Sequence, residues 1–155
     1  IVGNMADFET VFLVFELAET DLEKYLRKLR ENPKDRADFT MEFVEWYYVQ
    51  LLAAVQVCEK FGVVHRDIAP KNVLLFPDGT LKLGDFGLSR VIAGLETIPP
   101  YTVDTVQFLT AEVVTPMYRA PELFYNTGCY YSHKIDMWSV GCILAEMLAV
   151  SIGPE

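Results

Sequence analysis

Cysteine and basic residues are scarce in this sequence, and each shortage excludes a class of protein. The three cysteines, Cys58, Cys129 and Cys142, are odd in number and widely spaced, which fits neither a disulfide framework nor a zinc cluster and favours a reducing setting. Lysine and arginine total 13 against 22 aspartate and glutamate residues, for a formal net charge of −9. Such a chain has no general affinity for nucleic acid or anionic membranes. We therefore predict an intracellular protein, cytoplasmic or nuclear, with no nucleic-acid or membrane partner.

Apolar residues, in contrast, make up 52% of the chain and charged residues only 23%, which excludes a disordered or collagen-like protein. A length of 155 residues suits one domain or a part of one. Because Ile1 stands where an initiator methionine would, we expect a part of a longer protein.

The apolar run at residues 137–153 has two interpretations, a membrane span or a buried helix. It is shorter than the ~20 apolar residues that a transmembrane helix needs, and it carries Glu146 in its interior. We therefore predict a helix buried in a globular core and keep a membrane-associated protein as a competing hypothesis.

Local patterns predict one strand and two helices in the first 60 residues. Residues 10–17 (TVFLVFEL) are apolar and β-branched over a length typical of a buried strand. A short amphipathic helix begins after Asp21 as the cap and stops at residues 32–33, Asn-Pro. A second helix begins after Thr40 and runs to about Lys60; because apolar residues nearly encircle it, we expect it at the centre of the fold.

Residues 72–85 predict a β-hairpin, because Pro77-Asp78-Gly79 separates two alternating apolar runs. Asn72 and Asp85 lie symmetrically about the Asp78-Gly79 turn, so we expect both at the open end of the hairpin, on strands about 5 Å apart. One carboxylate and one amide carbonyl are hard oxygen ligands of the kind that Mg²⁺ combines with substrate phosphates. The pattern therefore predicts a magnesium site.

Two further residues next to this site suit phosphoryl transfer. Asp67 lies five residues before Asn72, where a carboxylate can receive a hydroxyl proton while the metal holds phosphate. Lys71 supplies a cation for the charge on the transferring phosphoryl group. Each residue taken singly has an ordinary explanation as a turn, strand-start or solvated residue, and only the combination points to this chemistry.

The strings VVHRDIAPKNVLLF, GDFGLSR, TPMYRAPELF and DMWSVGCILAEML follow one another along the chain. Together they resemble the signature set of the eukaryotic protein kinases, with its HRD, DFG and APE motifs in order. The last two strings are most similar to the CMGC group, which contains the cyclin-dependent and mitogen-activated kinases. The resemblance implies an α+β protein-kinase-like fold truncated at both ends. Residues 1–17 would then form the end of the N-lobe and the hinge strand, and residues 18–155 a mainly helical C-lobe.

The resemblance also implies a serine/threonine protein kinase that transfers the γ-phosphate of Mg-ATP to a protein hydroxyl. Asp67 would be the catalytic base, Asn72 and Asp85 would bind Mg²⁺, and His65 and Phe86 would pack behind them.

The run LVFELAETDL resembles the strand and hinge that hold adenine. By this likeness Phe15 would be the gatekeeper, Glu16 and Ala18 would offer backbone hydrogen bonds, Asp21 would face the ribose, and Leu74 would lie beneath the base. Without the motifs downstream, the same run is interpreted as a core strand followed by a helix cap.

One position departs from the family pattern. Serine/threonine kinases of this kind usually have lysine two residues after the catalytic aspartate, where this chain has Ala69; Lys71 stands two positions later, as the cation of tyrosine kinases often does. Thr115, in TPMYRAPE, matches the serine/threonine form of the substrate loop, where it would contact the catalytic aspartate and lysine. We therefore predict a serine/threonine kinase. The alternative, drawn from Ala69 and an unfamiliar activation loop, is a pseudokinase or regulatory binding module that keeps the fold without turnover.

Residues 89–120 show no sustained period and predict a long loop. Within it, Thr110 occupies the place of the activation-loop phosphosite of cyclin-dependent kinases. Phosphate there would order the loop by pairing with Arg66 and Arg90. By the same likeness, Asp136 would accept hydrogen bonds from the HRD backbone.

The implied partners are a protein substrate and an activating kinase or regulatory subunit. The 155 residues contain neither the family's glycine-rich loop nor its lysine for the α- and β-phosphates. We therefore expect these residues alone to be inactive and not to fold stably.

Overall fold

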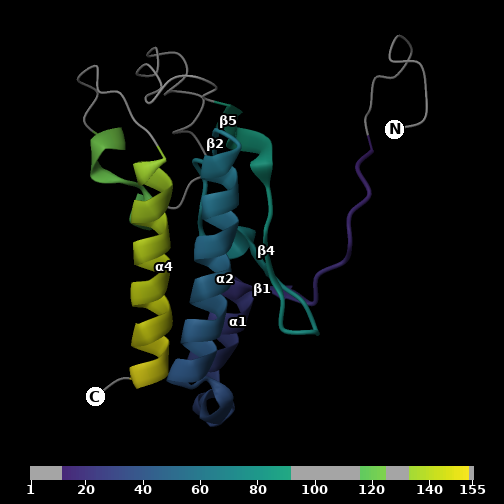
Figure 1. Ribbon diagram of the computed structural model, residues 1–155. Helices are drawn as coiled ribbons and strands as arrows, with labels where there is room; N and C mark the ends of the chain where they lie inside the picture. The colour runs from purple at the N-terminus through teal and green to yellow at the C-terminus, as the bar shows by residue number, and fades with distance from the viewer. Residues whose placement is uncertain (1–11, 92–115, 125–132, 154–155) are drawn as a thin grey trace.

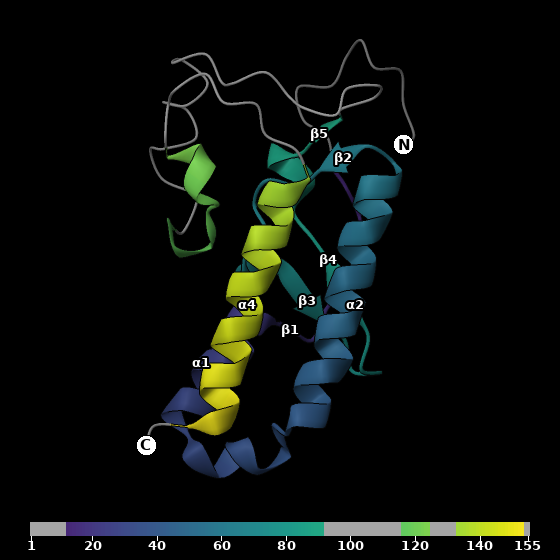
Figure 2. The ribbon, with the colours of Figure 1, turned by 60° about the vertical axis from the view of Figure 1, so that its left-hand side comes forward.

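The computed structural model describes residues 12–91, 116–124 and 133–153. Figure 1 shows the long helix α2 between helix α4 on one side and a β-hairpin on the other. Figure 2 shows the small sheet lying against one side of this pair of helices. In chain order the described elements are β1 (Thr20–Asp21), α1 (Leu22–Glu31), the 3₁₀ segment η1 (Pro33–Asp38), α2 (Met41–Lys60), β2 (Val63–Val64), η2 (Pro70–Asn72), β3 (Val73–Leu75), β4 (Leu81–Leu83), η3 (Phe86–Leu88), β5 (Arg90–Val91), η4 (Pro116–Tyr118), η5 (Pro121–Leu123) and α4 (Lys134–Ile152).

Both predicted helices of the first 60 residues begin and end where their caps indicated. The Asp21 carboxylate accepts a hydrogen bond from the Lys24 backbone N–H at 2.9 Å, and α1 ends directly before Asn32. The Thr40 hydroxyl accepts from the Phe43 N–H at 3.4 Å at the start of α2. These caps satisfy N–H groups that the first helical turn leaves without partners inside the helix.

The main core lies between α2, α4 and α1. Both long helices bury one face in it, α2 through Val44, Tyr47, Leu51 and Val55, and α4 through Val140, Ile143, Met147 and Val150. Helix α2 lies between α4 and the hairpin, the central place that the sequence predicted, although Trp46, Val49 and Val57 on its surface are exposed.

Helix α4 carries the apolar run for which the sequence left two interpretations. Among the described residues it is the one helix long and apolar enough to cross a membrane, by length and composition. In the structure it packs against α2 and α1 and buries residues along most of its length, in line with the predicted core helix.

The predicted hairpin is present, but its register differs by one residue. Strands β3 and β4 are antiparallel with Val73 opposite Leu83, and β1 pairs with the other edge of β3. The turn holds three residues, because Phe76 N–H donates to the Thr80 carbonyl and Gly79 adopts φ 79°. A second sheet pairs β2 with β5. Residues 90–91 are therefore strand, where the sequence predicted loop, because β2 supplies a partner.

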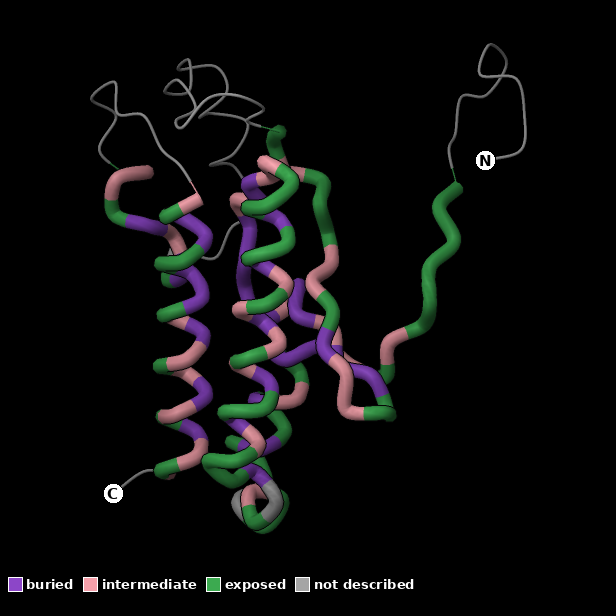
Figure 3. Tube along the Cα trace, in the orientation of Figure 1, coloured by how far each residue is buried: buried purple, intermediate pink, exposed green. Residues whose placement is uncertain are grey.

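The prediction of a buried strand at residues 10–17 is wrong for its described part. Residues 12–18 form no strand, and Figure 3 shows most of this stretch as an exposed segment that leaves the body of the fold. Phe12 is 86% and Val14 96% exposed. A strand needs a neighbour for its backbone and a layer over its apolar side chains. Among the described residues no strand pairs with this stretch, and the exposed ion pair of Glu16 with Lys82 of β4 does not cover its apolar side chains.

Candidate active site

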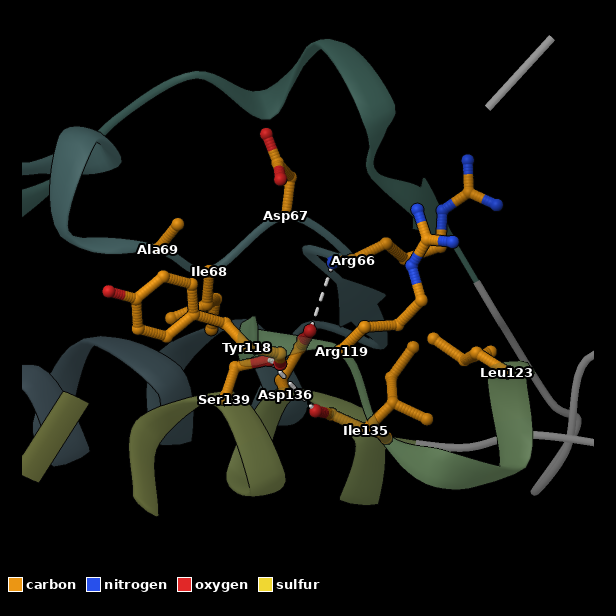
Figure 4. A pocket seen from close by; sticks show the side chains of 11 residues that line it. Arg66, Asp67, Ile68, Ala69, Tyr118, Arg119, Leu123, Ile135, Asp136 and Ser139 are labelled. Atoms are coloured by element: carbon orange, nitrogen blue, oxygen red, sulfur yellow. Dashed lines mark hydrogen bonds between the residues drawn. The ribbon is translucent and has the colours of Figure 1, made fainter. Parts of the chain in front are cut away.

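The loop between β2 and β3, residues 65–72, is anchored by a carboxylate far along the chain. Asp136, in the first turn of α4, accepts hydrogen bonds from the backbone N–H groups of His65 (2.8 Å) and Arg66 (2.9 Å), as the resemblance implied. Figure 4 draws the bond from Arg66. Asp136 is 1% exposed; burial raises its pKa, and the two backbone hydrogen bonds oppose that rise. Arg66 has φ 71°, a left-handed conformation that these contacts stabilise.

Asp67 is 3% exposed, and neighbours on the same loop engage one of its carboxylate oxygens. The Asn72 side-chain amide donates to the Asp67 carbonyl (2.8 Å) and to Asp67 Oδ2 (3.0 Å), and Lys71 Nζ lies 3.5 Å from the same Oδ2. The other oxygen, Oδ1, is buried with no hydrogen-bond partner among the described residues. An unpaired buried acceptor costs about 1–3 kcal/mol. The structure thus brings the predicted base, cation and amide together and leaves one oxygen of the base for an incoming donor.

Their symmetry about the turn predicted that Asn72 and Asp85 would lie directly opposite each other, and the structure differs from this prediction. The Gly84 N–H donates to the Asn72 carbonyl at 2.8 Å, so Gly84 is the residue opposite Asn72. Asp85 follows in a left-handed conformation (φ 56°), is exposed, and accepts a hydrogen bond from the Gly87 N–H at 3.2 Å. No hydrogen bond links the side chains of Asn72 and Asp85, and the one-residue shift of register is the reason.

The two side chains nevertheless have the oxygen atoms that Mg²⁺ requires. The Asn72 amide directs its nitrogen at Asp67, which leaves its carbonyl oxygen as the available ligand atom. The Asp85 carboxylate keeps one oxygen outside its bond to Gly87. A few hard oxygens are what Mg²⁺ takes from proteins when substrate phosphates supply others, so these residues fit the metal.

His65 and Phe86 pack behind the loop. Their ring centroids are 4.7 Å apart in a T-shaped contact, and His65 Nε2 lies 2.9 Å from the Gly84 carbonyl oxygen. His65 is buried, whereas Phe86 is partly exposed. The contact ties the 65–72 loop to the segment that carries Asp85.

Arg66 and Arg90 both lie near the two-stranded sheet of β2 and β5: Arg66 follows β2 in the loop, and Arg90 belongs to β5. Arg66 Nε donates to the Leu88 carbonyl at 2.5 Å, and Arg90 is an exposed residue of β5 opposite Val64. Thr110, the predicted phosphosite, lies outside the described residues, as does Thr115, so the roles assigned to both stay predictions.

Comparison with known proteins decides the family of this arrangement. The family model described as "Protein kinase domain" matches residues 1–152. The chain belongs to the protein kinase family. The predicted family and its α+β fold are therefore confirmed.

Two relatives of this kinase chain place it among CMGC kinases, as predicted. It is 40% identical over 146 residues to "Extracellular signal-regulated kinase 1" of Candida albicans (strain SC5314 / ATCC MYA-2876), an alignment that covers 94% of this chain and 31% of that protein. It is 42% identical over 139 residues to "Cyclin-dependent kinase C-2 C" of Arabidopsis thaliana, covering 90% of this chain and 19% of that protein. The chain thus spans less than a third of the length of these relatives.

The residues assigned to adenine and ribose are only partly assembled in this kinase chain. Asp21 and Leu74 are register partners on β1 and β3. Phe15 and Glu16 lie on the exposed stretch instead, and the Glu16 carboxylate pairs with Lys82 of β4. Ala18 is half-buried just before β1.

Asp21 also has local partners that the ribose assignment did not include. Its carboxylate caps α1 and lies 2.8 Å from Lys24 Nζ. The plainer interpretation of this segment, a helix cap, is thus confirmed for Asp21.

Sequence reasoning missed three residues that shape the kinase site. At Gly84 an added Cβ would lie 2.9 Å from Leu74 Cδ1, so only glycine fits without displacement of that side chain. Arg119 lines a small pocket together with Arg66, and Figure 4 shows the two side chains next to each other. Tyr118 lines the same pocket. All three belong to the kinase-like strings GDFGLSR and TPMYRAPELF, and this position was the signal that could have identified them.

Proposed function

We propose that the protein carrying this chain is a serine/threonine protein kinase that uses Mg-ATP to phosphorylate a hydroxyl of another protein. One observation carries the proposal: buried Asp67 shares Oδ2 with Asn72 and Lys71 and keeps Oδ1 unpaired among the described residues. A carboxylate in this state accepts a proton from a hydroxyl that reaches it. The relatives named as kinases support the same activity.

In the proposed reaction Asp67 orients the acceptor hydroxyl and takes its proton as the hydroxyl oxygen forms a bond to the γ-phosphorus. The bond from that phosphorus to the β–γ bridging oxygen breaks, and ADP leaves. Lys71 Nζ, 3.5 Å from Asp67 Oδ2, provides positive charge on the side of the base. It is 30% exposed, which leaves it able to turn toward the transferring phosphoryl group.

Asn72 and Asp85 would hold Mg²⁺ through the amide oxygen and the carboxylate. When bound, the metal supplies charge neutralisation between the phosphate groups. Asn72 also holds Asp67 in place through its two hydrogen bonds, so it links the base to the metal position.

A pseudokinase or regulatory binding module is the second candidate, and two observations favour it. Ala69 offers no cation at the usual position, and Phe15 is 79% exposed, so no described residue covers the gatekeeper side chain. Phe15, Glu16 and Ala18 would contact adenine only if residues 12–18 took the place of a hinge strand. The hydrogen-bonded set around Asp67 favours the active kinase, because a scaffold needs no buried unpaired carboxylate oxygen.

The deciding experiment compares wild type and Asp67→Asn in the full-length protein with radiolabelled ATP, Mg²⁺ and a general protein acceptor. We expect a loss of roughly 10²–10⁴-fold in kcat, since the proton acceptor is removed while the shape is kept. Asp35→Asn, an exposed carboxylate 3.8 Å from Lys28, is the matched control and keeps full activity. Nucleotide binding without phosphate transfer by the wild type would establish the binding module instead.

Regulation by phosphorylation at Thr110 is part of the proposal, together with an activating kinase or regulatory subunit as partner. Its support is the sequence position of Thr110, with Arg66 in the 65–72 loop and Arg90 on the neighbouring strand β5. Thr110→Ala in the full-length protein should lower activity, and unchanged activity of that variant contradicts the idea. The charge of −9 and the few cysteines support a cytoplasmic or nuclear location.

A further inference from the structure

Basic residues are concentrated in one short stretch of this acidic chain. Residues 22–36, which comprise α1 and most of η1, contain 6 of the 13 lysine and arginine residues but only 3 of the 22 aspartate and glutamate residues. The rest of the chain therefore holds 7 basic and 19 acidic residues, a formal charge of −12, against +3 for this stretch. An anionic partner is attracted to such a stretch and repelled by most of the remaining chain.

Helix α1 directs its charged side chains outward, because its apolar side chains face the main core. Leu22, Leu26 and Leu29 are buried there. We call the exposed cations of this region the basic face, which consists of Lys24, Arg27 and Lys28 on α1 and Lys34 on η1. Its residues lie on two consecutive elements that pack against each other, so they form one surface.

The two other cations of the stretch are engaged in the fold and are not part of the basic face. Arg30 pairs with Glu146 of α4 at 2.5 Å. Arg36 Nε donates a hydrogen bond to the Leu29 carbonyl at 2.9 Å, near the end of α1. These contacts hold α1 and η1 in place and thereby fix the position of the basic face.

The cations of the basic face have weak partners or none. Arg27 and Lys34 make no ion pair or hydrogen bond with another described residue. The Lys24 and Lys28 side chains pair with Asp21 (2.8 Å) and Asp35 (3.8 Å), but they are 65% and 67% exposed. Exposed pairs of this kind contribute little to stability, so both lysines can bind another carboxylate at small cost.

The basic face begins beside the 65–72 loop. Helix α1 packs against η2, the segment that carries Lys71 and Asn72. Asp21, which caps α1, is the register partner of Leu74. A helix of ten residues is about 15 Å long, a distance that an extended peptide covers in about five residues. A protein whose hydroxyl reaches Asp67 therefore has its neighbouring residues within reach of α1.

We propose that the basic face binds an acidic segment of the acceptor protein, close in sequence to the hydroxyl that receives phosphate. The inference rests on the proposed kinase function and names its substrate class, proteins in which aspartate or glutamate residues flank the acceptor serine or threonine. A short segment is favoured over a membrane or a nucleic acid, because an extended polyanion would also meet the acidic remainder of the chain. Screening within about 8 Å limits the attraction to groups that touch the basic face.

The first test measures binding to the full-length protein by fluorescence polarisation, with a fluorescein-labelled glutamate-rich peptide and its glutamine-rich counterpart. We expect only the first to bind, with an affinity that falls as the salt concentration rises. Arg27→Gln should weaken binding about two- to fivefold, and Arg27→Gln/Lys28→Gln/Lys34→Gln about tenfold or more. Lys60→Gln is the matched control without effect, since Lys60 is an exposed cation at the end of α2 opposite to η1.

A variant that gains affinity excludes loss of folding as the cause of the change. Glu31 is an exposed carboxylate in the last turn of α1, four residues after Arg27. Glu31→Gln should tighten binding of the glutamate-rich peptide about twofold, because it removes one repulsive charge. Weaker binding by this variant would contradict an electrostatic role for the basic face.

The second test places the acidic segment next to the acceptor hydroxyl. For the wild type, KM for a serine peptide flanked by glutamates should be about tenfold lower than for the same peptide flanked by glutamines. The triple variant should abolish this difference and change KM for ATP less than about twofold. Equal KM values for the two peptides in the wild type would overturn the assignment to the acceptor.

The polarisation measurement keeps the inference separate from the function on which it rests. If the wild type transfers no phosphate, the proposed function fails, and peptide binding alone decides whether the basic face holds an acidic segment. Equal affinity for the two labelled peptides, unchanged affinity in the triple variant, or an equal loss in Lys60→Gln and Arg27→Gln would each overturn the inference. Tighter binding of phosphatidylserine vesicles or single-stranded RNA than of the peptide would also overturn it.

Discussion

The catalytic loop at residues 65–72 and the apolar stretch at residues 12–18 both carry residues that the kinase resemblance assigns to ATP chemistry, yet their environments differ sharply. The loop is buried and its backbone is bonded to Asp136 on α4. In the stretch, Phe12 and Val14 are almost wholly exposed, and the first backbone hydrogen bond that follows it runs from Glu19 to Leu75. The 65–72 loop is therefore held in one conformation by hydrogen bonds to a distant part of the chain, whereas residues 12–18 have no such partner for their backbone among the described residues.

The largest effect should come from removal of the loop's distant anchor. Asp136→Ala leaves the buried N–H groups of His65 and Arg66 without an acceptor, which we expect to lower the free energy of unfolding by about 2–5 kcal/mol. Urea denaturation of the full-length protein measures this, with the exposed Asp35→Ala as control. A loss below about 0.5 kcal/mol would mean that the loop does not depend on α4 and would break the comparison.

A smaller effect should follow from Gly84→Ala, which tests how closely the chain after β4 approaches Leu74 of β3. The new Cβ would lie 2.9 Å from Leu74 Cδ1, and we expect a cost of about 1–2 kcal/mol from the displacement of that side chain. Leu74→Ala in the same protein removes the clashing atoms. The double variant should therefore be less destabilised than the sum of the two single variants, and simple additivity would contradict the contact.

The smallest expected effect is local and concerns the exposed stretch. If residues 12–18 act as the hinge in the full-length protein, Mg-ATP should slow amide exchange at residues 16–18 by about tenfold or more through hydrogen bonds to adenine. Exchange at residues 65–73 should change far less, because these amides lie in an already ordered loop and strand. Equal exchange at residues 16–18 with and without Mg-ATP would remove Phe15, Glu16 and Ala18 from the nucleotide site.

Much of the local structure was predictable, because its causes lie within a few residues. Asp21 and Thr40 cap the helices that they were predicted to cap. The hairpin was also predicted, but its register was not, since the symmetry of the sequence centred the turn between Asp78 and Gly79. The observed closure of Phe76 on Thr80 makes a three-residue turn and places Gly84 opposite Asn72.

The candidate site was predictable in its residues and less so in its contacts. Asp67, Lys71 and Asn72 stand within five positions of one another, so a single short loop necessarily brings them close. Asp85 follows the next strand, β4, as the cap of η3, and its left-handed backbone, which no pattern indicated, decides its direction. The hydrogen bonds by which the Tyr118 hydroxyl and the Arg30 guanidinium both reach the Glu146 carboxylate were not predicted at all.

The sequence by itself determined the helices, the hairpin, the set of polar residues in the 65–72 loop and the kinase family, because caps, turns and motif spacing act between near neighbours along the chain. The tertiary structure alone decided which carboxylates hold other segments by hydrogen bonds, as Asp136 does, and which keep an oxygen without a partner among the described residues, as Asp67 does. Asp136 is 71 positions from His65, and Glu146 is 116 positions from Arg30. Such pairs form only when apolar packing of α1, α2 and α4 sets their distance, and residues 12–17 remain exposed because no described element covers their apolar side chains.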